Sequence, residues 1–193
     1  MKSPKIGVLA LQGAFFKHAE MLHDLGAVAV EIRKPEQLRD CQGLILPGGE
    51  STTMQRRIDF IGMSDALHEF AQSKPVFGTC AGLILMSKSV VGESQNTFGW
   101  LDVVVERNGY GRQIESFGAK IDFQITSKKT KPFHGVFIRA PRIQEVGRDV
   151  EVLASYNDEA IAVRQGNYLA TSFHPELTED SSIHAYFLKN LLR

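Results

Sequence analysis

The sequence predicts an α/β fold with three layers: an open, mostly parallel sheet, helices on both of its faces, and additional antiparallel strands in the second half. Three observations lead to this fold class. Apolar, β-rich runs alternate with helical segments between residues 5 and 89, and this alternation is typical of a parallel sheet covered on both faces. From about residue 100, short strand-like runs succeed one another with turn signals between them. The 193 residues are enough for one substantial core, so we expect a single domain over 1–193.

The first half is expected to contain four strands and four helices. Apolar residues at Phe15, Ala19, Leu22 and Leu25 recur on one helical face and predict a helix over 14–26. Short β-rich runs bounded by glycine or proline predict the strands between the helices. The expected strands are 5–11, 28–32, 43–49 and 75–78, and the other expected helices are 51–58, 64–72 and 81–89.

The second half is expected to be mainly β structure with one closing helix. Its apolar runs are short and rich in β-branched and aromatic residues, which are common in strands. The sequence has no internal repeat, no low-complexity tract and no linker long enough to separate two domains. The expected strands are 100–108, 119–126, 135–140, 151–156, 161–166 and 168–173, and the closing helix is 181–192.

Composition argues against several classes of function. Apolar residues make up 43% and charged residues 23% of the chain, and the formal net charge is zero. A neutral chain lacks the broad attraction to nucleic acid or anionic membrane that a basic protein has, so we expect neither partner. No apolar run approaches the roughly 18 residues of a membrane span. Residues 1–16 are interpreted as a first strand and not as a signal peptide, because polar residues interrupt the apolar run and no small-residue cleavage site follows.

Cysteine usage indicates a reducing compartment. Cys41 and Cys80 are the two cysteines, too few for a disulfide framework or a zinc cluster. We therefore expect a cytoplasmic protein. Cys41 lies at the entrance to a strand with no candidate base beside it in the sequence, and we interpret it as structural.

The segment Gly78-Thr79-Cys80-Ala81-Gly82 places a cysteine between two glycines, where a predicted strand meets a predicted helix. This G-x-C-x-G pattern is the cysteine counterpart of the strand–turn–helix elbow of serine hydrolases, which presents a nucleophile above a parallel sheet. The helix N-terminus would favour the thiolate, and backbone N–H groups there would hold an oxyanion. A small buried core residue is the alternative reading, but the glycine pair favours a nucleophile.

A thiolate nucleophile usually needs a base, and the base needs a group that orients it. His174 stands in TSFHPEL (171–177), just past a predicted strand and so at the same edge of the sheet as Cys80. Pro175 keeps His174 out of the helical region, and Glu176 can turn back toward the imidazole. The alternative is that HPE is only a loop with a capping acid. The other histidines are interpreted as surface or flank residues of helices (His18, His23, His68), the start of a strand (His134) and part of the last helix (His184).

A second turn at this edge is PGGES (47–51), which follows a predicted buried strand. Its two glycines would let backbone N–H groups approach a ligand closely, and Ser51 would cap the next helix. A glycine pair alone is weak evidence, but its position one strand before the cysteine elbow strengthens it. Gln12, on the turn after the first strand, is also expected near this crevice.

Taken together, these motifs resemble the class I (triad) glutamine amidotransferases, whose fold is flavodoxin-like. Within that class the chain resembles the glutaminase subunits of pyridoxal 5′-phosphate synthase, the PdxT family. The resemblance spans nearly the whole chain and is carried by LALQGAFFKH (9–18), LPGGESTT (46–53), FGTCAGL (77–83), ERNGYGRQIESF (106–117), FIRAP (137–141) and ATSFHPELTED (170–180).

The resemblance implies a reaction and its residues. L-glutamine would be hydrolysed to L-glutamate and ammonia through a glutamyl thioester, with a catalytic triad of Cys80, His174 and Glu176. Backbone N–H groups at Gly48 and Ala81 would form the oxyanion hole. Family matching assigns glutamine binding to Gly49, Glu50, Ser51, Arg107, Ile138 and Arg139. The charges agree, because Glu50 suits an ammonium group and an arginine suits a carboxylate.

The resemblance also implies a partner. The ammonia would pass to a separate synthase subunit that makes pyridoxal 5′-phosphate (vitamin B6), in a large assembly expected to contain twelve copies of each subunit. No metal and no organic cofactor is expected in this chain, because the chemistry needs neither and pyridoxal phosphate is the product of the complex.

Three other interpretations remain open at this stage. The triad would also serve a cysteine hydrolase of another acyl substrate. An amidotransferase subunit for a different synthase, such as one for histidine or tryptophan, is a second possibility, against which GGESTT and RNGYGRQ argue. A non-catalytic regulatory subunit is the third, but it predicts a broken triad, and all three residues are present.

Overall fold

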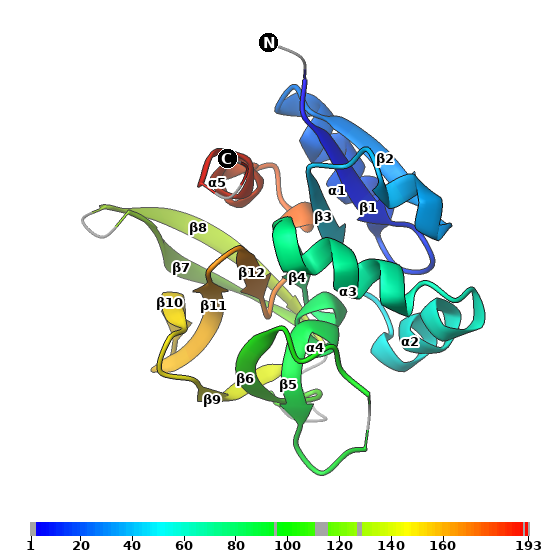
Figure 1. Cartoon of the computed structure of the whole chain (residues 1–193). Coiled ribbons are helices and arrows are strands. Elements are labelled where there is room, and N and C mark those ends of the chain that lie inside the picture. The colour runs from blue at the N-terminus through cyan, green and yellow to red at the C-terminus, as the bar shows by residue number, and fades with distance from the viewer. Residues whose placement is uncertain (1–2, 95, 111–115, 127–128, 191, 193) are drawn as a thin grey trace.

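The computed structural model describes residues 3–94, 96–110, 116–126, 129–190 and 192. A seven-stranded sheet forms the centre of the fold, and Figure 1 shows how the helices and smaller sheets are arranged around it. The strand order is β10-β11-β12-β4-β3-β1-β2. The five strands from β12 to β2 are parallel, and β10 and β11 add an antiparallel edge. These strands are β1 (Lys5–Leu9), β2 (Val28–Ile32), β3 (Gly43–Leu46), β4 (Val76–Thr79), β10 (Glu151–Tyr156), β11 (Glu159–Gln165) and β12 (Tyr168–Thr171). The predicted mostly parallel sheet with antiparallel additions is confirmed.

Helices pack on both faces of this sheet. One core joins the sheet to α2, α3 and α4, and a second core joins the opposite face to α1 and α5. Leu44 and Leu46 belong to the first core and Ile45 to the second, because successive side chains of a strand point to opposite faces. In Figure 1, α3 crosses in front of the sheet. The helices are α1 (Phe15–Asp24), α2 (Ser51–Phe60), α3 (Ser64–Ser73), α4 (Ala81–Met86) and α5 (Ser182–Asn190), with short 3₁₀ turns η1 (Pro35–Leu38) and η2 (Pro175–Leu177).

Two smaller sheets complete the second half. One has the order β5-β6-β9, and the other is a hairpin of β7 and β8 whose aromatic residues enter the second core. Among the described residues, no helix is long and apolar enough to cross a membrane. The additional strands are β5 (Ser87–Val90), β6 (Leu101–Glu106), β7 (Ser116–Thr126), β8 (Lys129–Ile138) and β9 (Arg142–Val146).

The structure differs from the sequence prediction most clearly around α4. The predicted helix over 81–89 ends at Met86, and Ser87 begins β5. The Ser87 hydroxyl donates to the Ile84 carbonyl at 2.8 Å while its backbone is extended, and β5 then pairs with β6. Local hydrogen bonding of this kind competes with helix continuation, so the helix prediction was too long by three residues.

Strands β8 and β9 were also predicted incompletely. β8 begins six residues before the predicted 135–140, so His134 lies in mid-strand and not at its start. β9 was not predicted, because its sequence RIQEV alternates weakly and three of its five residues are exposed. Both differences lie outside the central sheet, which contains the three neighbouring strands β12, β4 and β3. Their carboxyl ends lie side by side and lead into His174, Cys80 and Gly48 respectively.

Candidate active site

Cys80 lies at the turn between β4 and α4, where the sequence predicted a nucleophile elbow. Its backbone has φ 48° and ψ −99°, in a region that residues other than glycine rarely occupy. Two hydrogen bonds hold the turn: the Cys80 N–H donates to the Thr171 carbonyl at 2.8 Å, and the Ile84 N–H donates to the Cys80 carbonyl at 3.2 Å. A strained residue that faces a cavity is typical of a functional position.

The second glycine of the elbow lets α4 pack directly on β3. A Cβ on Gly82 would lie 2.1 Å from the carbonyl oxygen of Leu46, far inside van der Waals contact. The glycine spacing around Cys80 is therefore a packing requirement of this strand–turn–helix unit. That requirement explains why the G-x-C-x-G pattern predicted the turn.

His174 and Glu176 follow β12, the strand next to β4. The Glu176 Oε1 atom lies 2.7 Å from Nδ1 of His174, so the contact expected from the HPE sequence is present. The backbone N–H of His174 donates to the Val136 carbonyl at 2.8 Å, and this hydrogen bond fixes the loop after β12 to β8. Glu176 is buried, with 1% of its surface exposed, and His174 retains 8%. The carboxylate thus faces the core and the imidazole reaches the crevice.

The ionisation of this pair reflects burial opposed by specific partners. Burial lowers the pKa of His174, but hydrogen bonds with Cys80 and Glu176 and the charges of both groups outweigh it and raise the pKa to about 10. Burial likewise favours the neutral acid of Glu176, but the nearby His18 and His174 hold the pKa of this carboxyl well below its usual value. His174 and Glu176 therefore form an ion pair at neutral pH.

Gly48 lies directly against the imidazole of His174. A Cβ at Gly48 would be 2.3 Å from Cε1 of His174, so this close approach of backbone to ring requires glycine. Two residues further on, Glu50 donates its backbone N–H to Oε1 of Gln12 at 2.8 Å. The PGG turn is thereby tied to the loop after β1, at the crevice edge where the sequence predicted Gln12.

Glu50, not Ser51, caps α2, which corrects the prediction of a Ser51 cap. The Glu50 carboxylate accepts hydrogen bonds from the N–H groups of Thr52 at 3.1 Å and Thr53 at 2.6 Å, while Ser51 is the first helical residue. Burial would raise the pKa of Glu50, but these hydrogen bonds lower it to about 2. The same carboxylate lies 2.9 Å from Nη2 of Arg107. Two side chains predicted to bind glutamine therefore contact each other.

Ile138 and Arg139, two further predicted binding residues, line the same crevice. The carbonyl of Ile138 is 3.9 Å from Sγ of Cys80 and accepts a weak hydrogen bond from the thiol. Arg139 follows with φ 42° and an exposed side chain. Of the segment ERNGYGRQIESF (106–117), residues 111–115 lie outside the described part of the chain.

A cavity of about 290 Å³ unites these groups. Cys80 and His174 line it together with all six residues predicted to bind glutamine and with Gly48, whereas Glu176 and Ala81 lie behind its wall. Residues that the sequence did not single out also line it, among them Asn108 and Leu177. The Asn108-Gly109 dipeptide is a turn signal, and Asn108 has φ 48°, so its turn was visible in the sequence although its place at the crevice was not.

His18 contradicts its interpretation as a surface or flank residue of a helix. It is completely buried on α1, and its Nε2 lies 3.5 Å from Oε2 of Glu176. The signal was present in the sequence, because His18 precedes Leu22 by four residues and so shares its apolar face. His184 is also fully buried, while His23 and His68 are exposed as expected.

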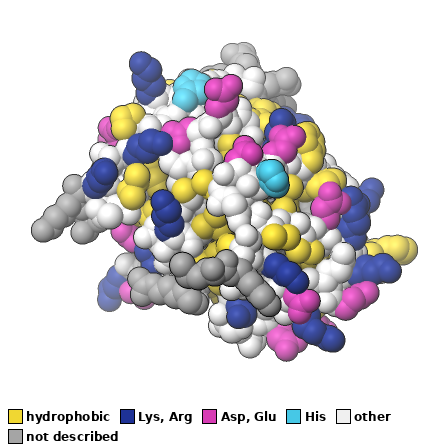
Figure 2. All heavy atoms as spheres, turned by 90° about the horizontal axis from the view of Figure 1, so that it is seen from above, with side chains coloured by type: hydrophobic (Ala, Val, Ile, Leu, Met, Phe, Trp, Pro, Cys, Tyr) yellow, Lys and Arg dark blue, Asp and Glu magenta, His cyan; other side chains and the backbone are white. Residues whose placement is uncertain are grey.

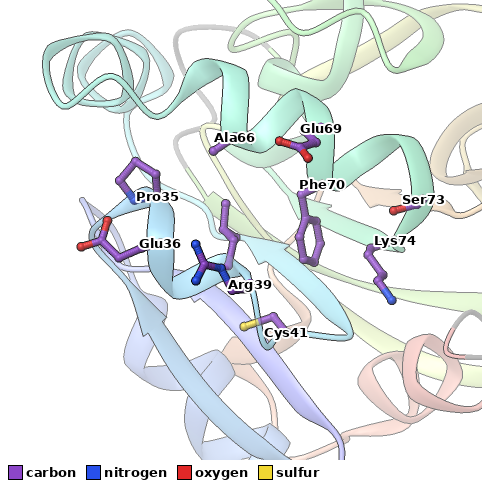
Figure 3. A pocket seen from close by; sticks show the side chains of 10 residues that line it. Pro35, Glu36, Arg39, Cys41, Ala66, Glu69, Phe70, Ser73 and Lys74 are labelled. Carbon is purple, nitrogen blue, oxygen red and sulfur yellow. The ribbon is translucent and has the colours of Figure 1, made fainter.

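A larger cavity, of about 580 Å³, lies away from these groups, between η1 and α3 (Figure 3). Cys41 lines it, and its thiol donates to the Gln37 carbonyl at 3.4 Å. Burial and the neighbouring Asp40 raise the pKa of the Cys41 thiol. No histidine is among the described residues that line this cavity. The chemistry of a thiol beside a base therefore favours the smaller cavity at Cys80.

Within the described residues, no group of three or more His, Cys, Asp or Glu side chains is arranged to hold a metal ion. The catalytic candidates of this site are Cys80, His174 and the carboxylate of Glu176 behind it. A thiol, an imidazole and a buried carboxylate at this spacing can attack an acyl carbon and move the associated protons.

Comparisons with known proteins agree on one family. The model of the SNO glutamine amidotransferase family matches residues 8–193. The chain is 53% identical over 186 residues to the "Pyridoxal 5'-phosphate synthase subunit PdxT" of Shouchella clausii (strain KSM-K16), covering 96% of this chain and 94% of that protein. It is 54% identical over 185 residues to the protein of the same name from Geobacillus thermodenitrificans (strain NG80-2), covering 95% and 93%.

Solved structures support the same fold. A structure titled "Crystal structure of glutamine amidotransferase" superposes with a TM-score of 0.89 at 48% identity and covers 95% of this chain and 97% of its own. The structure of PurLQS from Thermotoga maritima superposes with a TM-score of 0.71 at 16% identity, covering 99% and 100%. The second likeness shows the fold alone.

Proposed function

The chain belongs to the SNO glutamine amidotransferase family, and from that premise we propose how its crevice hydrolyses L-glutamine to L-glutamate and ammonia. The ammonia goes to a synthase subunit of pyridoxal 5′-phosphate synthase, the enzyme for which the PdxT relatives are named. The observation that carries the catalytic assignment is that the strained Cys80 and His174 line one cavity, while Oε1 of Glu176 lies 2.7 Å from Nδ1 of His174.

Cys80 is the nucleophile of the first half-reaction. Nδ1 of His174 is engaged by Glu176, so Nε2 is the atom that holds the proton given up by the thiol, in keeping with the raised pKa of His174. Sγ forms a bond to the side-chain amide carbon, and the amide oxygen becomes an oxyanion that N–H groups at Gly48 and Ala81 stabilise. The carbon–nitrogen bond breaks as His174 returns the proton to nitrogen, and ammonia leaves the glutamyl thioester.

Water completes the reaction. His174 takes a proton from a water molecule, whose oxygen attacks the thioester carbon. Collapse of the second tetrahedral intermediate breaks the carbon–sulfur bond, releases glutamate and returns a proton to Sγ of Cys80. Glu176 stays ionised throughout and stabilises the imidazolium, which agrees with its lowered pKa.

The charged ends of glutamine are bound by the residues around Glu50. Glutamine carries an α-ammonium and an α-carboxylate group, and the crevice presents both a carboxylate and guanidinium groups. Glu50 receives the ammonium, and Arg107 or Arg139 receives the carboxylate, with Gly49, Ser51 and Ile138 shaping the pocket. The contact of 2.9 Å between Glu50 and Arg107 supports this arrangement, because a zwitterion can take up both charges when it enters between them.

The assembly and its location extend this proposal. A complex of twelve copies of each subunit, working in the cytoplasm, is the arrangement that we infer by family resemblance. Basic and acidic side chains are interspersed on the face seen in Figure 2, and with a formal net charge of zero this surface suits a protein partner better than nucleic acid or an anionic membrane.

Labelling with an electrophilic glutamine analogue tests the assignment of the nucleophile. The label is expected on Cys80, since Cys41 has no histidine in its cavity and a raised pKa. Peptide mapping of the complex with the synthase subunit, with glutaminase activity measured on the same sample, gives the result. Inactivation with the label on Cys41 would remove Cys80 from the mechanism.

A further inference from the structure

A second imidazole lies behind the carboxylate of the triad. His18 comes from α1 and is completely buried. Its Nε2 is 3.5 Å from Oε2 of Glu176, and both side chains have no exposed surface. This distance is an ion-pair contact and slightly too long for a well-formed hydrogen bond. The contact lies on the side of Glu176 that faces away from His174.

The two oxygens of Glu176 have different surroundings. Oε1 contacts Nδ1 of His174 at 2.7 Å. Oε2 is buried and has no hydrogen-bond partner among the described residues. A buried carboxylate oxygen without compensation is costly, and Nε2 of His18 is the nitrogen that the structure brings near it. His18 therefore supplies the compensation that the free oxygen of the carboxylate requires.

The ring of His18 is itself held in place. Its Nδ1 lies 2.9 Å from Nε2 of His184 on α5, and its Nε2 lies 3.3 Å from the hydroxyl of Thr79 at the end of β4. Burial, followed by the proximity of His18, lowers the pKa of His184 to about 3, so His184 is neutral. Because His184 is neutral, it can exchange a hydrogen bond with His18 without adding charge to the core.

We propose that His18 is a positioning residue for glutamine hydrolysis: it holds Oε2 of Glu176, so that Oε1 stays aligned with Nδ1 of His174. This inference rests on the proposed function, because it assigns a task to a neighbour of the proposed triad. The resulting chain runs from Cys80 through His174, Glu176 and His18 to His184. It connects the crevice to the core through four parts of the fold: the β4–α4 turn, the segment after β12, α1 and α5.

The physical reason lies in the charge that His174 carries. Each half-reaction has an imidazolium at His174, and the carboxylate that stabilises it acts best at a fixed distance and angle. A carboxylate held by one oxygen can rotate about its last torsion, which is a soft one. A second contact at Oε2 opposes that rotation. A change that removes this contact should slow the chemical steps and leave glutamine binding intact.

Two substitutions at His18 separate this task from core packing. In His18→Gln, the amide nitrogen occupies a place near that of Nε2 and can still donate to Glu176. In His18→Asn, the shorter amide stays near His184 and withdraws from Glu176. Both variants lose the ring, so packing suffers in both, and only the asparagine variant loses the contact. His23→Asn on the same helix is the control, because the side chain of His23 is 88% exposed.

The experiment measures kcat and KM for glutamine in the complex with the synthase subunit. His18→Asn is expected to lower kcat about tenfold with KM changed less than about twofold, the scale for loss of one weak contact to a charged group. His18→Gln should recover most of this loss, and His23→Asn should match the unmodified complex. Equal kcat values for the two His18 variants would mean that His18 only fills the core.

Glu176→Gln connects the inference to the triad. Alone, it should lower kcat by a factor on the order of 10 to 10⁴, as for triad orienters, and adding His18→Asn to it should have little further effect because the shared task is already lost. If Glu176→Gln leaves kcat unchanged, the proposed triad fails. If it lowers kcat and His18→Asn does not, only the proposal for His18 fails.

A spectroscopic readout covers the case in which His18→Asn does not fold. In the complex, ¹⁵N-labelled histidine gives ring signals, and the signal that disappears in His18→Gln belongs to His18. Glu176→Gln is expected to move the Nε2 signal of His18, because it changes the charge of the neighbouring oxygen. A Nε2 signal that stays in place would overturn the proposal.

Discussion

At the scale of single residues, the proton affinity of His174 decides how the crevice works. Burial opposes an imidazolium there, yet Cys80 and Glu176 together raise the pKa of His174 to about 10. Glu176 in turn is kept ionised by two imidazoles on opposite sides. In the proposed mechanism, a base that already holds its proton beside the sulfur favours attack by sulfur, and the same proton is then available for the departing nitrogen.

This charge state predicts a pH dependence of folding stability. A histidine whose folded pKa lies above its unfolded value of 6.5 contributes stability that is fully present below pH 6.5 and is lost as the pH rises through about 10. The difference in free energy of unfolding between the unmodified chain and His174→Gln should therefore shrink over that range. Urea unfolding of both proteins across the range measures it, and a difference that grows with pH would contradict an imidazolium at His174.

At the scale of secondary-structure elements, the site depends on how closely α4 approaches β3. Gly82 lies where a Cβ would be 2.1 Å from the Leu46 carbonyl oxygen. Because Gly82 is helical, alanine would improve local helix propensity by about 1 kcal/mol. The backbone contact cannot give way as a flexible side chain would, so packing is the larger effect. The turn that presents Cys80 thus depends on one glycine in the helix after it.

Gly82→Ala is therefore expected to destabilise the protein by about 1–3 kcal/mol in spite of the better helix former, and to reduce glutaminase activity by displacing Cys80. Gly26→Ala is the matched comparison, since Gly26 has φ 78° and nothing within 4 Å of an added Cβ. It should cost about 1–2 kcal/mol through backbone strain alone and leave kcat unchanged. Urea unfolding measures the loss of stability in each variant, and the glutaminase assay measures kcat. A Gly82→Ala variant with normal activity would show that the elbow tolerates displacement of α4.

Elements whose local signals agree with their tertiary setting were predictable from the sequence. The strand at Val28–Ile32 and the strand–turn–helix unit around Cys80 followed from periodicity and from the glycine-flanked turn. Ser87 ended α4 early because pairing of β5 with β6, which is not local, took over its backbone. The strand at Arg142–Val146 was missed for a similar reason, since its pairing with β6 outweighs a weak pattern.

In the candidate site, too, features with a local sequence signal were predictable and features that depend on distant residues were not. The shared cavity of Cys80 and His174 and the contact of His174 with Glu176 were predictable because these residues stand at turns with a defined chemical pattern. The helical spacing of His18 and Leu22 indicated a buried histidine, but its contacts were not predictable, because its partners His184 and Glu176 are distant in sequence. The Glu50 cap was missed because Ser51, a common capping residue, follows it directly.

At the scale of the whole molecule, the crevice opens at one edge of the sheet and the chemistry after ammonia release takes place on another protein. Cys80 is 6% exposed, so its sulfur contributes almost nothing to the outer surface that a partner would contact. Apolar side chains near the cavity mouth, such as Leu177 at 40% exposed, are better placed for docking. The nucleophile and the docking surface can therefore be separated by mutation.

Cys80→Ala should abolish glutamine-dependent formation of pyridoxal phosphate and leave formation from an ammonium salt intact. The reason is that the thiolate acts only on the glutamine amide, whereas the carbon–nitrogen bond of the product forms in the synthase subunit. Product absorbance with each nitrogen source gives the result, and sedimentation or gel filtration shows that the variant still binds its partner. Loss of one buried sulfur leaves the surface unchanged, so the variant should still form the complex. If an intact complex of the variant failed to form pyridoxal phosphate from an ammonium salt, Cys80 would have a part in the synthase step. That result would contradict the proposal that this chain only donates ammonia.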